Sequence, residues 1–284
     1  MAQALTPPQP APSIVVGVDG SRAGLRAARW ALTEATARDL PLHLVAADEQ
    51  GDTAAAQSAL RAAATEVTAA ATPVVVRTDV IAGNPTEVLL EASRRAVMLC
   101  VGDVGLKHFD HAQAPSGGGV GSTAAALVAA AHCPVAVVRG DEPPQADRSG
   151  WVVVELDSTP DSAAVLQFAV EEARLRRAPL RALGTWQSTD HDPQTVEESG
   201  RMVRLQLDRR LEQWRHRYPD LDVTPIAVRD SGLTFLTENA ATIQLVVIGA
   251  RNTAAVAELL GPAGLSALHD TNCSILVVDS QRLL

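Results

Sequence analysis

The sequence predicts an α/β protein of two consecutive domains, each a doubly wound, parallel five-stranded sheet with helices on both faces. Short, continuous apolar runs alternate with stretches of helical periodicity, a pattern typical of parallel strands buried on both faces. The order of elements then repeats: residues 14–19 (IVVGVD) match residues 152–157 (VVVELD), 138 positions later. Such a repeat indicates an internal duplication, and 284 residues suit two domains of ordinary size.

The first repeat reads as five strands and four helices in alternation, which requires right-handed crossovers and a parallel sheet. Ala23, Ala27, Trp30 and Ala35 recur at helical spacing in the first of these helices. We expect strands over residues 13–19, 41–47, 74–81, 97–101 and 134–138, and helices over residues 22–38, 54–71, 86–95 and 123–131.

Four segments follow from composition and from the repeat. Residues 1–12 are rich in proline and are expected to be disordered. Residues 13–140 form the first domain, and residues 141–150, charged and proline-bearing, read as a linker. Residues 151–284 form the second domain, in which the amphipathic run 196–217 predicts a long helix that faces the core.

Composition and motifs exclude several classes of function. A net charge of −9 without a basic block argues against nucleic acid as a main partner. No apolar run reaches the roughly 18 residues of a membrane span, and the N-terminus lacks the pattern of a signal peptide, so we expect a cytoplasmic protein. Cys100, Cys133 and Cys273 read as buried small hydrophobic residues. No zinc-ligand spacing, nucleophile elbow or Walker A pattern occurs, so we expect no enzyme beyond slow ATP hydrolysis.

The stretch from residue 97 to residue 139 carries the candidate site. An apolar run stops at Gly102, a glycine-rich segment follows, and Ser122 and Thr123 stand where a helix N-cap is expected. Unpaired N–H groups and the helix dipole attract anions at such a position. Glycines let the backbone approach a ligand closely. These features predict an anion cradle, most plausibly for phosphate.

Three motifs resemble those of the universal stress protein family: Gly102-x-x-Gly105 followed by Gly121-Ser122, the run 16–21 (VGVDGS), and Val80-x-x-Gly83-x-Pro85. Together with the duplication, they make the whole chain similar to the tandem members found in actinobacteria. The resemblance implies an adenine-nucleotide α-hydrolase-like fold whose halves are related by a pseudo-twofold axis and pair through residues 134–138 and 274–279. It also implies ATP, with or without Mg, at Asp19, Gly20, Ser21, Gly83, Gly102, Gly105, Gly121, Ser122 and Thr123.

In that family the loop holds the ATP phosphates and the early aspartate lies beside the ribose and base. The spacer between the second and third glycines usually has nine residues, whereas here residues 106–120 are fifteen. Asp103 and Asp110 bring carboxylates near the loop, and Lys107, His108 and His111 could offset them. The plainer interpretations are a flexible connection for the glycines and an acidic helix cap for Asp19.

The second repeat has lost most of this pattern. Asn252 replaces Gly105, Glu155 replaces Gly17, and Pro262, which has neither an N–H nor a hydroxyl group, replaces Ser122. Asp157 is retained. We therefore expect the second half to keep the fold without the nucleotide.

Two functional hypotheses follow, and a third is weaker. The first is a stress-response regulator that binds ATP in its N-terminal half. The second is a module that binds no nucleotide and contacts an unidentified signalling protein. The edge strands could also pair with a second copy to form a homodimer, because an unpaired strand edge can bond to another chain. The third, a hydrolase with the same sheet, lacks the tandem glycines of that class after Asp19.

Overall fold

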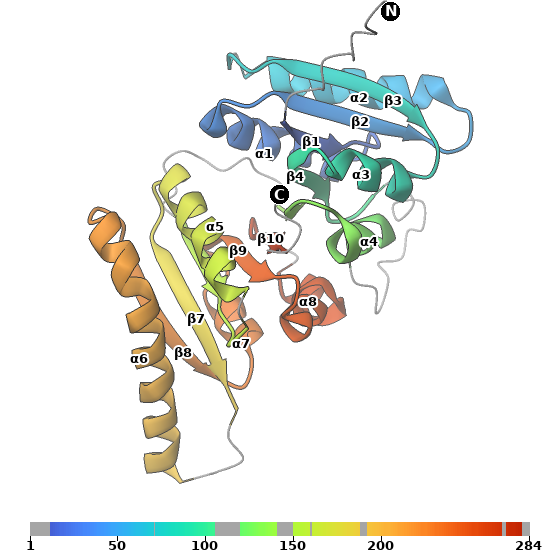
Figure 1. The fold of residues 1–284 in the computed structure, drawn as a ribbon. Coiled ribbons are helices and arrows are strands. Elements are labelled where there is room, and N and C mark those ends of the chain that lie inside the picture. Colours follow the sequence, from blue (N-terminus) through green and yellow to red (C-terminus); the bar gives the residue numbers. More distant parts are fainter. Residues whose placement is uncertain are drawn as a thin grey trace, which may run out of the picture.

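In the computed structural model, the chain forms one ten-stranded sheet with helices on both faces (Figure 1). The structure describes residues 12–70, 72–105, 120–140, 150–159, 161–187, 192–268 and 271–279. The expected disordered segment before residue 12, spacer residues 106–119 with Lys107, His108, Asp110 and His111, and linker residues 141–149 lie outside these ranges.

Each half contributes five parallel strands, and the two sets join in the middle of the sheet in the order β3-β2-β1-β4-β5-β10-β9-β6-β7-β8. The strands of the first half are β1 Ser13–Gly17, β2 Leu42–Asp48, β3 Val76–Ala82, β4 Ala96–Gly102 and β5 Val135–Val138. Those of the second half are β6 Trp151–Glu155, β7 Leu180–Trp186, β8 Val223–Arg229, β9 Ile243–Gly249 and β10 Ser274–Val278. The α/β class, the two parallel halves and the strand positions in the first half agree with the prediction.

The halves meet where β5 pairs with β10 in antiparallel orientation. Ala136 pairs with Leu276, and these two residues occupy the same position in the two repeats. A pair of equivalent positions facing each other places the pseudo-twofold axis between them. Because β5 and β10 lie in the interior of the sheet, neither is an edge available to a second chain, and the edges are β3 and β8.

Helices cover the two faces in separate layers, and each layer packs on a hydrophobic cluster that runs through both halves. One layer contains α1 Arg22–Arg38, α2 Thr53–Thr68, α5 Ser162–Leu175 and α6 Pro193–Arg217. The other contains α3 Pro85–Ser93, α4 Ser122–Ala130, α7 Gly232–Glu238, α8 Thr253–Leu260 and α9 Pro262–Ala267. The three cysteines are buried, as predicted, and burial raises the pKa of each thiol. Among the described helices, none combines the length and apolarity needed to cross a bilayer.

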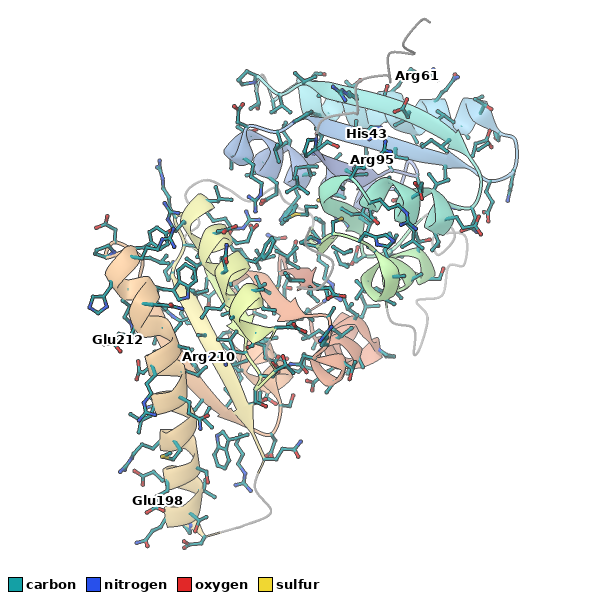
Figure 2. The ribbon with its side chains drawn as sticks, in the orientation of Figure 1. His43, Arg61, Arg95, Glu198, Arg210 and Glu212 are labelled. Carbon is teal, nitrogen blue, oxygen red and sulfur yellow. The ribbon has the colours of Figure 1, made fainter. Side chains whose placement is uncertain are left out.

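The long helix α6 faces the core as expected, through Leu207 and Leu211. Glu198 and Glu212 are exposed on its outer side (Figure 2). Arg210 reaches back to the end of β6, where its Nη1 donates to the carbonyl oxygen of Asp157 at 2.9 Å.

Two buried glutamates and two partly buried arginines join α1 to α5 across the junction. Arg38 pairs with Glu172 at 2.5 Å, and Arg176 pairs with Glu34 at 2.5 Å. Within each helix, Arg38 also contacts Glu34 at 2.9 Å and Arg176 contacts Glu172 at 3.2 Å. The Arg176 guanidinium lies over the ring of Trp30, 4.9 Å from its centroid. Both acids and both arginines are separated by 138 positions, so this quartet follows the same pseudo-twofold axis.

Candidate functional site

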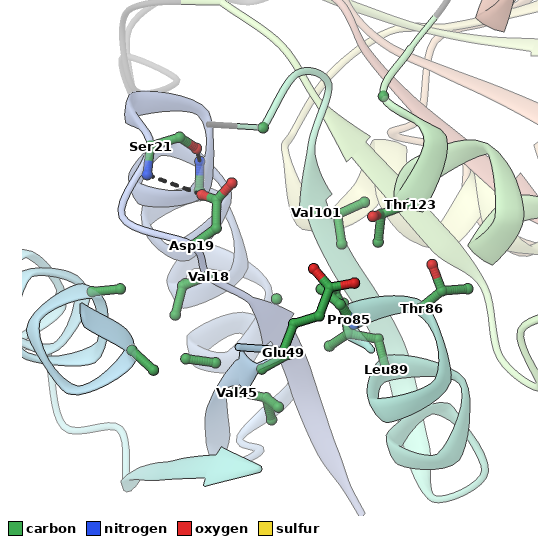
Figure 3. Close-up of a pocket in the computed structure, with 18 of the residues that line it drawn as sticks. Val18, Asp19, Ser21, Val45, Glu49, Pro85, Thr86, Leu89, Val101 and Thr123 are labelled. Atoms are coloured by element: carbon green, nitrogen blue, oxygen red, sulfur yellow. Dashed lines mark hydrogen bonds between the residues drawn. The ribbon is translucent and has the colours of Figure 1, made fainter. Parts of the chain in front are cut away.

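A cavity of about 490 Å³ opens at the carboxyl ends of β1, β2 and β4, where ligands bind in open α/β sheets (Figure 3). The starts of α1, α3 and α4 close its sides. Most of the predicted site residues line it: Asp19, Ser21, Gly102, Gly105, Gly121, Ser122 and Thr123. Gly20 and Gly83 are not among its lining residues; they turn the chain beside it, with φ angles of 84° and 135° that favour glycine.

The anion cradle begins at α4, and its cap differs from the prediction. Gly121 is the N-cap, with φ −52° and ψ 147°, and Ser122 is already the first helical residue. The prediction that Ser122 caps the helix is therefore wrong. Ser122 lies inside the first turn, where its side chain cannot accept from the N–H groups as that of an N-cap residue does, and Gly121 has no side chain. Among the described residues, no side chain caps this helix, and residues 121–124 line the cavity. The backbone N–H groups of a helix start at this place suit an anion.

The loop is held against α4 by its own backbone. The Gly121 N–H donates to the carbonyl oxygen of Asp103 at 2.8 Å, and the Asp103 N–H donates to Val138 at 3.2 Å. The Asp103 carboxylate pairs with Arg26 at 3.3 Å and is not among the residues lining the cavity. The like-charge repulsion expected from Asp103 is thereby reduced.

Asp19 combines the two roles that the sequence left open. Its Oδ1 accepts from the backbone N–H of Ser21 at 2.9 Å, and Ser21 in turn caps α1 by accepting from the Gly24 N–H at 3.0 Å. Its Oδ2 faces the loop, because a Cβ at Gly105 would lie 2.9 Å from that oxygen. Asp19 thus orders the start of α1 and presents a carboxylate oxygen at the cradle.

Two glycines of the motif serve packing. A Cβ at Gly102 would lie 2.6 Å from the Cβ of Ala23, so this glycine lets β4 approach α1. A Cβ at Gly17 would lie 2.6 Å from Cδ1 of Leu89, so this one makes room for α3. Helix–strand packing therefore explains part of a glycine pattern that the sequence assigned to a ligand.

The charged side chains that line the described cavity are all carboxylates: Asp19, Asp48, Glu49 and Asp52. The carboxylate of Glu49 points into the cavity (Figure 3) and accepts from Asn84 Nδ2 at 3.1 Å. We call these four residues the acidic wall. The sequence motifs did not predict it, although two consecutive acids at the end of the second strand, Asp48 and Glu49, were a usable signal. Within the part of the chain that the structure describes, no three His, Cys, Asp or Glu side chains are placed to hold a metal ion.

In the second half, the buried carboxylate of Glu155 lies at the position equivalent to Gly17. Glu155 is only 8% exposed, and its Oε2 would lie 2.9 Å from a Cβ at Gly232. Asn252 caps α8 and lies 3.5 Å from the other Glu155 oxygen. Burial, together with the negative charge of Glu258, raises the pKa of Glu155 to about 7. A buried carboxylate at this place opposes a phosphate.

Family comparison agrees with this architecture. Residues 12–139 and 151–279 each match the model of the universal stress protein family. The chain belongs to this family. The Mycobacterium tuberculosis universal stress protein Rv2028c is 39% identical over 284 residues, covering 96% of this chain and 98% of the relative. Universal stress protein Rv2624c of the same organism is 38% identical over 275 residues, covering 94% and 96%.

A solved structure shows the same fold. A universal stress protein from Archaeoglobus fulgidus superposes with a TM-score of 0.65 at 11% identity, covering 94% of this chain and 96% of that one. A shorter universal stress protein, solved in complex with cAMP, covers 44% of this chain and 94% of its own at 27% identity and a TM-score of 0.36. The tandem arrangement and a role in the stress response follow from the family.

Proposed function

We propose that this universal stress protein binds ATP in its N-terminal half and acts as a nucleotide-dependent regulatory module rather than as an enzyme. The observation that carries the proposal is the cavity at the carboxyl ends of β1, β2 and β4, which the uncapped first turn of α4 borders. Backbone N–H groups of that turn and of the Gly105 region would hold phosphate oxygens. Asp19 would accept a hydrogen bond from a ribose hydroxyl.

The acidic wall favours a nucleotide that arrives with a divalent cation. Four carboxylates face the cavity, and a bare triphosphate would be repelled by them. Mg²⁺ bound to the phosphates lowers that charge and gives Glu49 or Asp48 a favourable partner through water. We therefore expect Mg-ATP to bind more tightly than ATP in the presence of a chelator.

Equilibrium titration with ATP, with and without Mg²⁺, tests the proposal. Gly121→Ala is the informative variant, because its new methyl group would meet only ordinary contacts, 3.5 Å from the Asp103 carbonyl oxygen and 3.8 Å from the Gly105 nitrogen. The fold is kept while the cradle becomes narrower, so we expect affinity to fall about tenfold or more. Gly200→Ala on α6, whose methyl would lie 3.6 Å from the Trp186 ring, is the matched control and should bind like wild type.

The stoichiometry should be one nucleotide per chain, because the second half places the buried carboxylate of Glu155, with Asn252 beside it, at the equivalent end of its sheet. Two nucleotides per chain, or equal affinity in wild type and Gly121→Ala, would contradict the proposed site. Asp19→Asn keeps the acceptor for Ser21 and removes the charge, so it separates the capping role of Asp19 from its role at the ligand.

The acidic wall also supports the second candidate, a module that binds no nucleotide and contacts a signalling protein. Protein purified from cells distinguishes the two: adenine nucleotide found by mass spectrometry supports the first, and its absence together with no binding in titration supports the second. The signalling partner, the homodimer and the cytoplasmic location stay predictions.

A further inference from the structure

The second half touches the candidate nucleotide site of the first half through the last turn of α8. The Val120 N–H donates to the carbonyl oxygen of Leu260 at 3.0 Å. Arg139, at the end of β5, donates from its Nη2 to the carbonyl oxygen of Leu259 at 3.1 Å. Val120 directly precedes Gly121, the N-cap of α4. The start of the anion cradle is thus bonded to the other half of the chain.

Arg139 is a buried cation behind the loop. It is 3% exposed, its backbone N–H donates to Ser274 Oγ at 3.3 Å, and burial lowers the pKa of its guanidinium. Carbonyl groups at the end of a helix carry partial negative charge, which suits a guanidinium. Asp103 accepts the Gly121 N–H through its own carbonyl group. Val138, the residue before Arg139, accepts the Asp103 N–H through its carbonyl oxygen at 3.2 Å. Arg139 therefore joins the end of α8 to the end of β5, to which the residue that holds the cradle is bonded.

The same helix is fixed in the second half at sites remote in sequence from the cradle. Asn252 accepts from the Ala255 N–H at 3.2 Å at its start. On its side, Glu258 accepts from Ser231 Oγ, the N-cap residue of α7, at 2.5 Å. Helix α8 lies between β9 and α9, where the first half has its loop, and its last turn is bonded to Val120 beside the cradle of the first half.

We propose that α8, through Arg139 and Val120, is a positioning element of the first-half nucleotide site, so that the second half controls nucleotide affinity there. The inference rests on the proposed function. Nucleotide binding at the cradle and the stability of α8 are coupled reciprocally. A nucleotide that orders the cradle must also stabilise α8, and a change that loosens α8 must weaken nucleotide binding. The bonds named above form the physical connection.

Glu258→Ala tests this from the far side, since it removes the bond to Ser231 without altering any residue of the cavity. Hydrogen exchange is measured by mass spectrometry in free protein and with Mg-ATP, alongside the titration. We expect faster exchange at residues 120–125 in the free variant and about fivefold weaker Mg-ATP binding. In wild type, Mg-ATP should slow exchange at residues 253–260. Glu258→Gln, which can still accept from Ser231, should restore most of the affinity, and Glu198→Ala on the exposed side of α6 should behave as wild type.

Unchanged affinity in Glu258→Ala, with exchange in α8 unaffected by Mg-ATP, would overturn the inference while leaving the proposed function intact. If wild type binds no nucleotide, the proposed function fails, and the exchange of residues 120–125 in free protein decides whether α8 supports the loop. Faster exchange in Glu258→Ala would support that link, and identical exchange would refute it.

Discussion

Replacing Arg176 with methionine should destabilise the protein by breaking the charge quartet between α1 and α5. The side chains of Glu34 and Glu172 are 1% and 0% exposed, and that of Arg176 is 6% exposed. Methionine keeps an apolar side chain of similar length but removes the guanidinium over Trp30, and it leaves two buried carboxylates with Arg38 alone. Removing one partner of a buried ion pair costs about 3–5 kcal/mol, because the remaining charge stays desolvated.

Urea unfolding followed by tryptophan fluorescence measures this loss. The matched control is Arg201→Met, which breaks an Arg–Glu pair of the same i,i+4 spacing, but one whose side chains are 66% and 76% exposed. Exposed pairs contribute about 0–1 kcal/mol, so the control should remain close to wild type. Burial raises the pKa of Glu172 and the nearby Arg176 lowers it. Without Arg176 the Glu172 carboxyl group should therefore protonate more readily, so the loss should be smaller at pH 5 than at pH 8.

The double variant Glu34→Gln/Arg176→Met completes the cycle. Neutralising one carboxylate removes part of the uncompensated charge. The double variant should therefore lose less free energy of unfolding than the two single variants lose together, by about 1–3 kcal/mol. A loss below about 1 kcal/mol in Arg176→Met, or strict additivity in the cycle, would refute the view that the quartet holds the halves together.

Two further outcomes follow from the packing and ionisation of single residues. The pKa of Glu155 is raised from 4.5 to about 7, so the native state binds the proton of this carboxyl group more tightly than the unfolded state does. The resulting contribution to the free energy of unfolding is fully present below about pH 4.5 and is lost as the pH rises through 7, a change on the order of 3 kcal/mol. In urea titrations, Glu155→Gln should flatten the decline of the free energy of unfolding between pH 5 and pH 8, whereas Glu197→Gln on the exposed side of α6 should not. An unaltered pH dependence in Glu155→Gln would contradict the raised pKa of Glu155. Gly102→Ala should cost about 1–3 kcal/mol, because its methyl would lie 2.6 Å from the Ala23 Cβ; a thermal midpoint equal to that of wild type would show that β4 can move away from α1.

Local sequence patterns determined much of the fold. Apolar runs and helical periodicity predicted the strands and helices of the first half to within a few residues. Both patterns arise because residues close together in the sequence share the buried face of one strand or helix. The repeat at 138 positions predicted two similar domains, and the resemblance to the universal stress protein family implied the pairing of β5 with β10. The glycine motif located the cavity, although helix α4 begins one residue earlier than its Ser122 cap would require.

The tertiary structure decided what lies around those elements. Gly102 faces Ala23, Asp103 faces Arg26, and Glu34 faces Arg176, all contacts between residues far apart in the chain. Such contacts depend on strand register and on the axis between the halves, neither of which leaves a local pattern. The acidic wall and the bonds from α8 to the cradle arise in the same way. The amino-acid sequence alone therefore specified two domains and one candidate anion site, whereas only folding determined which charges surround that site and that the second half supports it.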